Sequence, residues 1–387
     1  MLRVLTLATL FPDASRPNFG VFVERQSLGL AAHPGVELRV VAPIGVPPWP
    51  LSLHPRYAGL RALPKQETWK GVPVERPRFP VLPGTGGRWS ARLLARALAP
   101  LLAEMRRDFP FDVIDAEFFF PDGPAAVALG QRFGVPVSIK ARGADIHHWG
   151  QGPTARHVIT AGQAAEGLLS VSDALKADMV AIGLPAERIR VHRTGVDLDR
   201  FAPVDRAAAK AGLGIDGPLV VSVGALIPRK GHDVVIDAVA ALPGVSLLIA
   251  GEGPERPDLV RRIARFGAGD RIRLLDAVPH AELPALIGAA DVMALASSSE
   301  GLANAWVEAL ACGTPVVITG AGGAREVVTD PAYGRIAGRS APEFAAAIGD
   351  LLAHPPAPAT VRKGAEPFTW VANTAGLFEH LSGLAGR

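Results

Sequence analysis

Short apolar runs alternate with helically spaced apolar positions along most of the chain. Strand-like runs cover residues 4–10, 38–42, 113–116, 135–141, 167–171, 219–223, 246–250, 272–275, 292–296 and 315–319. Helical patterns lie between them, at residues 22–32, 122–133, 174–182, 232–241, 257–266 and 281–289. Strands that alternate with helices in this way form parallel sheets with helices on both faces. Because the alternation occurs twice, the sequence predicts an α/β protein with two doubly wound, Rossmann-like domains.

The division between these domains is predicted from a loss of periodicity. Residues 194–203 are rich in Gly, Asp and Pro, and a chain of 387 residues is too long for one ordinary core. We predict a first domain over residues 1–195 and a second over 196–368, with a C-terminal helix within 369–387 that packs back on the first. Residues 45–87 have the least regular pattern, and so long a segment is expected to cover or line a site.

Composition narrows the class of protein. The net charge is only +3 and no long basic run occurs, which argues against a nucleic-acid partner. The single cysteine, Cys312, rules out an internal disulfide framework and is expected to be a small buried side chain. No apolar run is long enough to span a membrane, and residues 1–11 fit a buried first strand better than a signal peptide. A cytoplasmic protein is the expectation.

Residues 299–317 place two carboxylates around a turn and a helix. Glu300 precedes a glycine, small residues follow, and Glu308 lies eight positions further on. A helix that begins near Asn304 would direct the amides of residues 301–304 at an anion, because helix N-termini bind phosphates. The isolated alternatives are a capping acid for Glu300 and a surface carboxylate for Glu308.

Two other strand ends in the second domain carry suitable chemistry. Gly224 ends a strand, and Arg229 and Lys230 follow just before a helix, where two cations would neutralise a diphosphate. The alternative is a solvated basic turn. Gly251-Glu252-Gly253 follows the next strand, where glycines let a backbone approach a ligand. The third glycine and distal acid of a dinucleotide fingerprint are missing, which argues against a nicotinamide enzyme.

The first domain offers a matching set of polar residues. Arg142 and Asp145 follow a strand and are expected to face the ligand side of the sheet, and Gly20 lies where a loop enters the first helix. His147 and His148 are interpreted as ordinary polar residues, because adjacent histidines point apart and no third metal ligand accompanies them.

Residues 88–108 combine arginines with leucines in a helical pattern. Such a helix either packs its apolar stripe into the core or lies on an anionic membrane surface, and we favour the core. Pro100 is expected to interrupt or kink it.

Taken in order, these motifs resemble those of the retaining GT-B glycosyltransferases of glycosyltransferase family 4, which use nucleotide sugars. The resembling segments span nearly the whole chain: residues 20–26, 121–123, 142–145, 171–172, 194–197, 229–231, 251–254 and 300–317. The resemblance implies two Rossmann-like domains that face each other across a cleft, with the sugar donor bound mainly by the second. It also implies that no divalent metal or other cofactor is needed.

The resemblance assigns roles to individual donor-side residues. Arg229 and Lys230 would clamp the diphosphate, Glu308 would hold the ribose hydroxyls, and Glu300 would contact the transferred sugar. The backbone near Val278 would meet the nucleobase. The implied donor site also includes Gly224, Gly251, Glu252, Gly301, Leu302, Ala303 and Asn304.

On the acceptor side the resemblance implies Gly20 and Arg142, with Arg142, Asp145 and Glu300 as the catalytic residues. The acceptor would be a glycan or lipid-linked molecule of the cell envelope. The reaction would be hexosyl transfer with retention. The expectation of a cytoplasmic protein stands, and contact with the inner face of the membrane is suggested only by the helical pattern of residues 88–108.

The chain departs from the family pattern where it has Arg142 in place of a common histidine and Ala225 in place of a common arginine. An arginine cannot act as a base. These departures support one alternative, a nucleotide-sugar-binding protein that has lost transfer activity. An epimerase or phosphorylase of the same fold is a further alternative, for which the sequence offers no acid-base set and no cofactor lysine.

Overall fold

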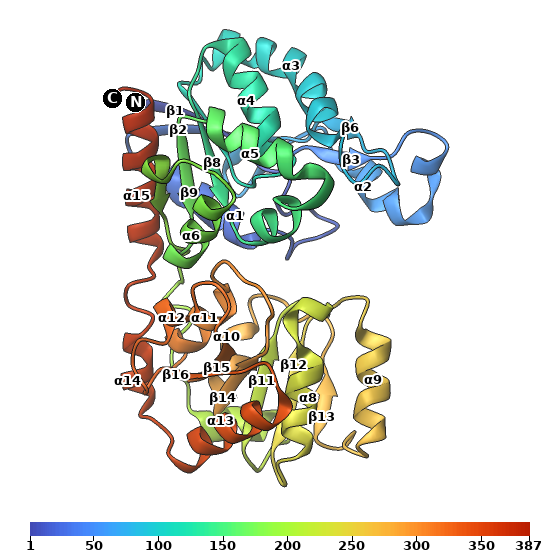
Figure 1. The fold of residues 1–387 in the computed structure, drawn as a ribbon, viewed down its shortest axis with the longest axis vertical. Helices are drawn as coiled ribbons and strands as arrows, with labels where there is room; N and C mark the ends of the chain where they lie inside the picture. Colours follow the sequence, from blue (N-terminus) through green and yellow to red (C-terminus); the bar gives the residue numbers. More distant parts are fainter. The chain divides into compact units, whose positions relative to one another are not determined.

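The computed structural model describes all 387 residues, and the chain divides into two compact units. Unit 1 comprises Met1–Arg193 and Trp370–Arg387, and unit 2 comprises Thr194–Thr369. Each unit is built on a sheet of mainly parallel strands with helices packed against it (Figure 1). This architecture confirms the predicted doubly wound α/β fold.

Unit 1 contains an eight-stranded sheet in the order β10-β9-β8-β7-β1-β2-β5-β4. Only the β4–β5 pair is antiparallel. The strands are β1 (Leu2–Leu7), β2 (Val36–Val41), β4 (Gln66–Trp69), β5 (Val72–Glu75), β7 (Val113–Ala116), β8 (Val137–Ala141), β9 (Gly167–Ser170) and β10 (Ile189–Val191). The central strands β7, β8 and β9 are buried along their whole length, as expected for strands covered on both faces.

The helices of unit 1 supply the layers around this sheet. They are α1 (Val21–Ala31), α2 (Ala58–Ala62), α3 (Ser90–Asp108), α4 (Asp122–Phe133), α5 (Ala155–Ala164), α6 (Asp173–Ala181) and α15 (Trp370–Leu384). Short helical turns occupy η1 (Leu51–Leu53), η2 (Pro55–Tyr57), η3 (Asp145–Trp149), η4 (Gly152–Thr154) and η5 (Ala186–Arg188). The C-terminal helix α15 packs against α1 and contacts β7 and β8. Its buried Leu377 and Leu381 join a core that also contains Val4 and Val40.

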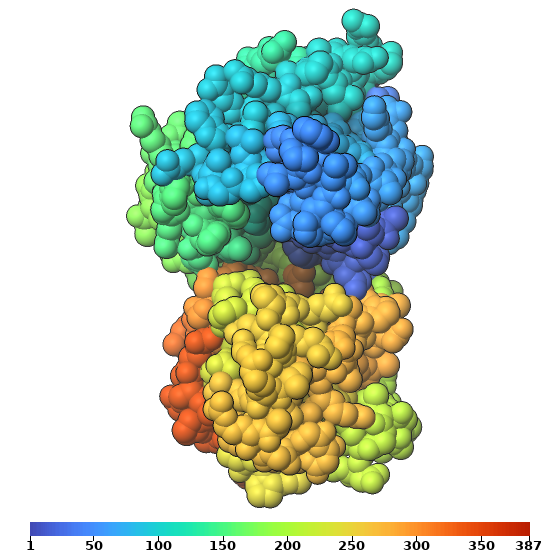
Figure 2. Space-filling model, turned by 90° about the vertical axis from the view of Figure 1, so that its right-hand side faces the viewer, coloured from blue at the N-terminus to red at the C-terminus, as the bar shows by residue number.

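Residues 45–87 are more regular than the sequence pattern suggests. Besides the β4–β5 hairpin, they contribute β3 (Ile44–Val46) and β6 (Arg78–Pro80), which form a separate two-stranded sheet. These strands are only three or four residues long, too short for a period to be visible. The sheet of β3 and β6 packs against α3 through β6, so the blue and cyan segments lie side by side on one face of unit 1 (Figure 2).

Unit 2 contains a six-stranded, fully parallel sheet in the order β13-β12-β11-β14-β15-β16. The strands are β11 (Leu219–Val223), β12 (Ser246–Ala250), β13 (Ile272–Leu274), β14 (Val292–Leu295), β15 (Val316–Thr319) and β16 (Gly334–Ala337). The helices are α7 (Arg206–Gly212), α8 (His232–Ala240), α9 (Arg256–Arg265), α10 (Leu283–Ala289), α11 (Asn304–Ala311), α12 (Ala324–Val327), α13 (Ala341–Ala353) and α14 (Pro358–Lys363), with the turn η6 (Pro228–Lys230). The strand order reverses between β11 and β14, which is where ligands of doubly wound sheets bind.

Helix α3 continues through Pro100, which lies inside it without interrupting it. Pro100 is exposed, so the carbonyl that its missing N–H leaves without a partner can be solvated. The buried stripe of α3, which includes Leu94, Leu98 and Leu102, faces the core. Helix α3 is therefore an amphipathic helix of the folded unit, with its arginines outside.

Candidate functional site

The predicted donor residues of unit 2 lie at the carboxyl ends of four neighbouring strands. Gly224 follows β11, Gly251 follows β12, Val278 lies beyond β13 and Glu300 beyond β14. Because all four strands are parallel and adjacent, their carboxyl ends meet at one edge of the sheet. The structure thus gathers motifs that are as far apart as residues 224 and 300 on one edge.

Glu300 is the centre of a compact ionic cluster on this edge. Its Oε1 atom lies 2.5 Å from Nζ of Lys230 and accepts a 2.8 Å hydrogen bond from Oγ of Ser297. Its Oε2 atom lies 3.1 Å from a terminal nitrogen of Arg229, which also donates to the carbonyl of Ser299 at 2.5 Å. The two predicted cations therefore hold the predicted acid directly.

Charge decides the protonation state of this cluster. Burial by itself raises the pKa of Glu300, but the charges of Lys230 and Arg229 outweigh burial, so its pKa is lowered from 4.5. Two cations against one carboxylate leave a net positive charge at the strand ends. Such a surplus suits an anionic ligand that carries more than one negative charge.

Glu308 lies in α11, one turn beyond the segment that follows Glu300. Its Oε1 atom is 3.0 Å from Nε2 of His280, and its side chain is 13% exposed. His280 packs edge-on against the ring of Phe201, which fixes the imidazole. The sequence reasoning missed His280, although it lies two residues beyond Val278 in the same strand-end loop.

The glycines of the 251–253 segment serve the chain itself. A Cβ atom on Gly251 would lie 1.9 Å from the carbonyl oxygen of Gly224, and one on Gly253 would lie 2.3 Å from that of Leu226. Gly251 also has a φ of 154°. Both glycines are therefore required by the close approach of the loop after β11, which carries the Arg229–Lys230 turn.

His232 lies just after the Arg229–Lys230 turn and stabilises it. It is fully buried at the start of α8, and its Nδ1 atom lies 3.0 Å from Oγ of Ser222 in β11. Burial lowers the pKa of His232 to about 4. The imidazole is therefore neutral at physiological pH and adds no charge to the neighbouring cations.

In unit 1 the structure corrects the expected exposure of Asp145. Its side chain is fully buried, and its carboxylate accepts from the backbone amides of Arg142 at 2.9 Å, Gly143 at 2.8 Å and Phe119 at 3.3 Å. Burial raises the pKa of Asp145, against the opposing effect of these hydrogen bonds. Asp145 fixes the loop that carries Arg142 and does not itself face solvent, because short polar side chains readily bond to nearby amides in turns.

Arg142 is held by Glu117, which the sequence reasoning missed. The guanidinium pairs with the Glu117 carboxylate, and its Nε atom donates to the Glu117 carbonyl at 2.9 Å. The guanidinium carbon also lies 4.7 Å from the ring centroid of Phe22 in α1, two residues after Gly20. The contact with Phe22 places Arg142 near the start of α1, which Gly20 precedes. Glu117 directly follows β7, a strand-end position that could have identified it.

A buried polar network continues from Glu117 to the C-terminal helix. Gln26 donates to Glu117 and accepts from Lys140, whose Nζ lies 2.7 Å from Nδ1 of His192. His192 Nε2 lies 2.7 Å from the carbonyl of Asn373 in α15. Burial lowers the pKa of Lys140 to about 7, and the nearby charge of Arg142 adds to this effect. Arg142 is therefore fixed by groups that are themselves locked in the core.

A cavity of about 240 Å³ opens in unit 1 next to the loop that carries Arg142. Its walls are mostly apolar, with Ile44, Phe79, Phe120 and Trp149 among them and Arg16 as a charged lining residue. The rings of Phe120 and Trp149 lie 5.2 Å apart between centroids. Residues 45–87 supply part of this lining, so the segment expected to line a site does line a cavity.

The remaining sequence candidates have structural roles. His147 lies 2.8 Å from Asp178, and the chain contains no group of three or more His, Cys, Asp or Glu placed to hold a metal ion. Cys312 is buried as predicted, and burial raises the pKa of its thiol to about 12. Every helix of the structure is too short or too polar to span a bilayer.

Comparison with known proteins identifies families and relatives that this chain resembles. Residues 20–200 match the model of Glycosyltransferase Family 4, and residues 205–367 match that of Glycosyl transferases group 1. D-inositol 3-phosphate glycosyltransferases of Mycobacterium tuberculosis and Mycobacterium bovis are 42% identical over 178 residues, which is 44% of this chain. The matched segment spans only 37% of the length of those relatives.

Solved structures with the same fold cover the whole chain. Sucrose-phosphate synthase from Thermosynechococcus elongatus has a TM-score of 0.82 at 20% identity, over 99% of both chains. HepE from Anabaena, in complex with UDP, has a TM-score of 0.75 at 20% identity, over 99% of this chain and 100% of that one. The two family models together account for both units, and the chain belongs to the GT-B glycosyltransferases described by them.

Proposed function

We propose that this protein transfers a sugar from a nucleotide-diphosphate sugar, bound by unit 2, to an acceptor bound by unit 1. The observation that carries the proposal is the cluster of Glu300, Lys230 and Arg229 at the carboxyl ends of the strands. Supporting it, one structural relative, HepE from Anabaena, is solved in complex with UDP-glucose and in complex with UDP and glucose.

The donor would bind by exchange of partners within the cluster. Lys230 and Arg229 would turn from Glu300 to the diphosphate, and the released carboxylate would accept hydroxyls of the transferred sugar. Glu308 has one oxygen, Oε1, engaged with His280, and its Oε2 remains for the ribose hydroxyls. Fixed cations would stabilise the charge that develops on the leaving diphosphate.

We propose that the transfer retains the configuration of the donor, and the carboxylates near Arg142 support this, since inversion requires a base for the acceptor proton. Asp145 is buried against backbone amides, and Glu117 is paired with Arg142, so neither is free to take a proton from an acceptor hydroxyl. The leaving phosphate oxygen would take that proton, as the new glycosidic bond forms on the face from which the diphosphate departs. Arg142, which stays charged, would polarise the acceptor or bind an anionic group on it.

The acceptor is proposed to be a glycan or lipid-linked molecule of the cell envelope. The cavity beside the Arg142 loop supports this class, because aromatic walls suit either a sugar face or an apolar chain. An epimerase or phosphorylase is not favoured by any contact in the structure.

The proposal is tested by following a labelled nucleotide sugar with and without an acceptor. We expect the label to pass to the acceptor with the anomeric configuration of the donor, and to water slowly without one. An epimerised sugar nucleotide, or release of sugar phosphate with inorganic phosphate, would replace this proposal by one of the alternatives. Inverted configuration would contradict the mechanism alone.

A further inference from the structure

His280 joins two segments of unit 2 in the candidate donor site. It belongs to the loop between β13 and α10, and its Nε2 atom lies 3.0 Å from Oε1 of Glu308 in α11. The two side chains are largely buried, with 20% and 13% of their surfaces exposed. Within the chain, this is the only hydrogen bond that the Glu308 carboxylate makes. The position of that carboxylate therefore depends on one imidazole.

The chemistry of this contact fixes the hydrogen on the ring. An ionised carboxylate can only accept hydrogen bonds, so Nε2 of His280 carries the hydrogen and donates it to Glu308. The second ring nitrogen, Nδ1, is buried and has no hydrogen-bond partner. Buried polar atoms are seldom left without a partner, because their desolvation costs free energy. A ring that bears this cost and makes a single hydrogen bond is expected to have its function in that bond.

Packing holds the imidazole from another side. The ring of Phe201 lies edge-on to His280, with 5.5 Å between the ring centroids, and Phe201 is 1% exposed. The backbone at His280 is fixed as well, since the amide of Glu282 donates to the carbonyl of Pro279 at 2.8 Å. His280 is therefore a rigid donor that keeps the Glu308 carboxylate in one orientation.

The contact leaves the carboxylate with one oxygen for a ligand. Oε2 of Glu308 makes no hydrogen bond within the chain, whereas Oε1 is held by His280. A fixed acceptor that loses its water when a nucleotide binds has to be satisfied by a hydroxyl of that nucleotide. A nucleotide that lacks the hydroxyl leaves the acceptor unpaired, and sites of this kind reject such analogues strongly. A mobile carboxylate would turn toward solvent and would discriminate less.

We propose that His280 is a positioning residue that orients Glu308, and that the pair makes the donor site prefer ribose over deoxyribose. The inference rests on the proposed function, because it assigns the ribose hydroxyls to Glu308. His280 itself does not contact the nucleotide, since its Nε2 donates to Glu308 and its Nδ1 is buried. Its effect on binding passes through the carboxylate.

The test is the affinity of the whole chain for UDP, GDP and ADP and for the 2′-deoxy and 3′-deoxy form of each. In the wild type, the form without the hydroxyl that Glu308 holds should bind about 10-fold more weakly, the usual size for a hydrogen bond to a charged group. In His280→Leu this ratio should fall to about 2-fold. His280→Gln, whose amide can also donate to Oε1, should keep most of it. Inorganic pyrophosphate should bind His280→Leu as it binds the wild type, because Arg229 and Lys230 are unchanged.

A double variant shows whether His280 acts through Glu308. Once Glu308→Gln has removed the charged acceptor, adding His280→Leu should change the ribose preference no further, since both substitutions remove the same interaction. Full additivity of the two losses would show that His280 acts independently and would overturn the proposal.

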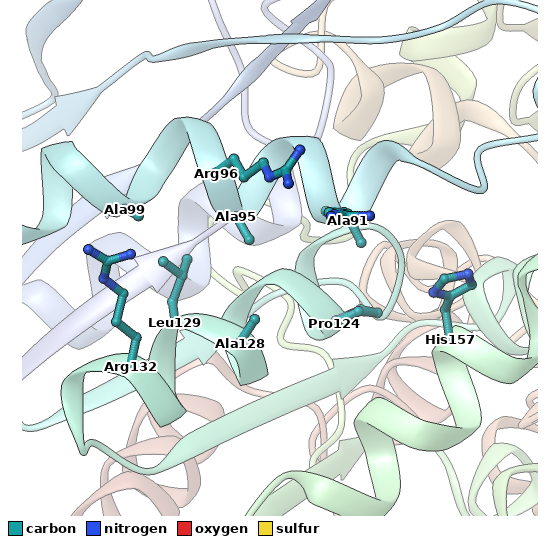
Figure 3. Close-up of a pocket in the computed structure, with 10 residues that line it drawn as sticks. Ala91, Ala95, Arg96, Ala99, Pro124, Ala128, Leu129, Arg132 and His157 are labelled. Atoms are coloured by element: carbon teal, nitrogen blue, oxygen red, sulfur yellow. The ribbon is translucent and has the colours of Figure 1, made fainter.

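Two controls remove histidines elsewhere. His354→Leu breaks an exposed pair, with 3.3 Å between Nδ1 of His354 and Oδ1 of Asp350. His157→Leu changes an exposed histidine of α5 beside the groove between α3 and α4 (Figure 3). Both variants should keep the wild-type ribose preference.

The possible failures can be told apart. An unchanged ribose preference in His280→Leu would overturn the proposal, as would a loss of pyrophosphate binding by the same factor as nucleotide binding, which means general damage to the site. A wild type that binds a nucleotide but shows no ribose preference contradicts this inference alone. If no nucleotide binds the folded wild type, the proposed function fails, and this inference fails with it.

Discussion

The two units share one architecture but treat their charged residues in opposite ways. In unit 2 the candidate cations remain accessible, since the side chain of Arg229 is 33% exposed and that of Lys230 is 14% exposed. In unit 1 the Arg142 side chain is 9% exposed and that of Glu117 only 1%. Glu300, the shared partner of Arg229 and Lys230, is only 8% exposed, so these cations can turn to a ligand only if that ligand also satisfies the carboxylate, whereas in unit 1 both members of the pair are buried. Unit 2 is therefore built to change contacts, and unit 1 to hold Arg142 still.

Lys230→Ala tests whether the exposed cations of unit 2 bind the diphosphate, and it has the largest expected effect. It removes a preorganised cation from the leaving diphosphate, which should lower the transfer rate by about 10²–10³-fold. Initial rates of transfer, taken with the donor sugar bound, measure this loss. The control is Lys363→Ala, which changes an exposed lysine of the same unit. Unchanged rates would remove Lys230 from the mechanism.

Glu117→Gln tests the buried pair of Arg142 and Glu117 in unit 1. It leaves Arg142 without its buried partner and should lower the free energy of unfolding of unit 1 by about 3 kcal/mol. Hydrogen exchange in β7 and β8 reports this loss. The control is Glu379→Gln, which breaks the exposed pair with Arg190 and should cost less than about 1 kcal/mol. Equal costs for the two variants would show that burial of the Arg142 pair is unimportant.

Acid should weaken both units, because each contains a histidine whose pKa is lowered in the folded chain. Burial lowers the pKa of His232 in unit 2 and of His380 in unit 1 to about 4, from 6.5. As pH falls from 6.5 toward 4, each of these histidines binds a proton in the unfolded chain but stays neutral in the folded chain. Each histidine should therefore cost up to about 3 kcal/mol of stability across this window.

The measurement is the free energy of unfolding as a function of pH for His232→Gln and His380→Gln. Each variant should show a shallower decline than the wild type between pH 6.5 and 4, whatever its stability at neutral pH. Slopes identical to the wild-type slope would mean that the histidines titrate normally in the folded protein.

Glu308→Gln should produce the smallest effect, confined to nucleotide binding. Loss of a charged acceptor for the ribose hydroxyls should weaken the Kd of a nucleoside diphosphate about 10-fold. The control is Glu282→Gln, an exposed acid just before α10. A variant that binds the nucleotide as tightly as the wild type would reassign Glu308 to supporting His280.

The sequence predicted most of this arrangement because strand ends carry visible signals. Buried strands such as β7, β11 and β12 have the predicted bounds, since continuous apolar runs mark them clearly. Strand β1 ends at Leu7, three residues early, because the following apolar residues belong to the loop that Gly20 approaches. The short strands between residues 45 and 87 could not be predicted from periodicity.

The side-chain partnerships were harder to predict than their positions. Glu300, Lys230 and Arg229 were expected near one ligand, but sequence spacing could not show that they pair with each other. Lys140 reads as an interruption of an apolar strand, and its partners Gln26 and His192 come from distant segments. Asp145 was expected to face a ligand because a motif cannot show whether a carboxylate turns outward or back onto its own loop.

The central claim, that unit 2 binds a diphosphate through exchangeable cations, is tested most directly by calorimetry. UDP, GDP and ADP are titrated into the protein with a chelator present, and again into the Lys230→Ala variant. We predict that at least one of them binds the wild type without a divalent metal and that the variant loses most of this affinity. Failure of all three to bind a folded wild-type protein, or equal binding by the variant, would contradict the account.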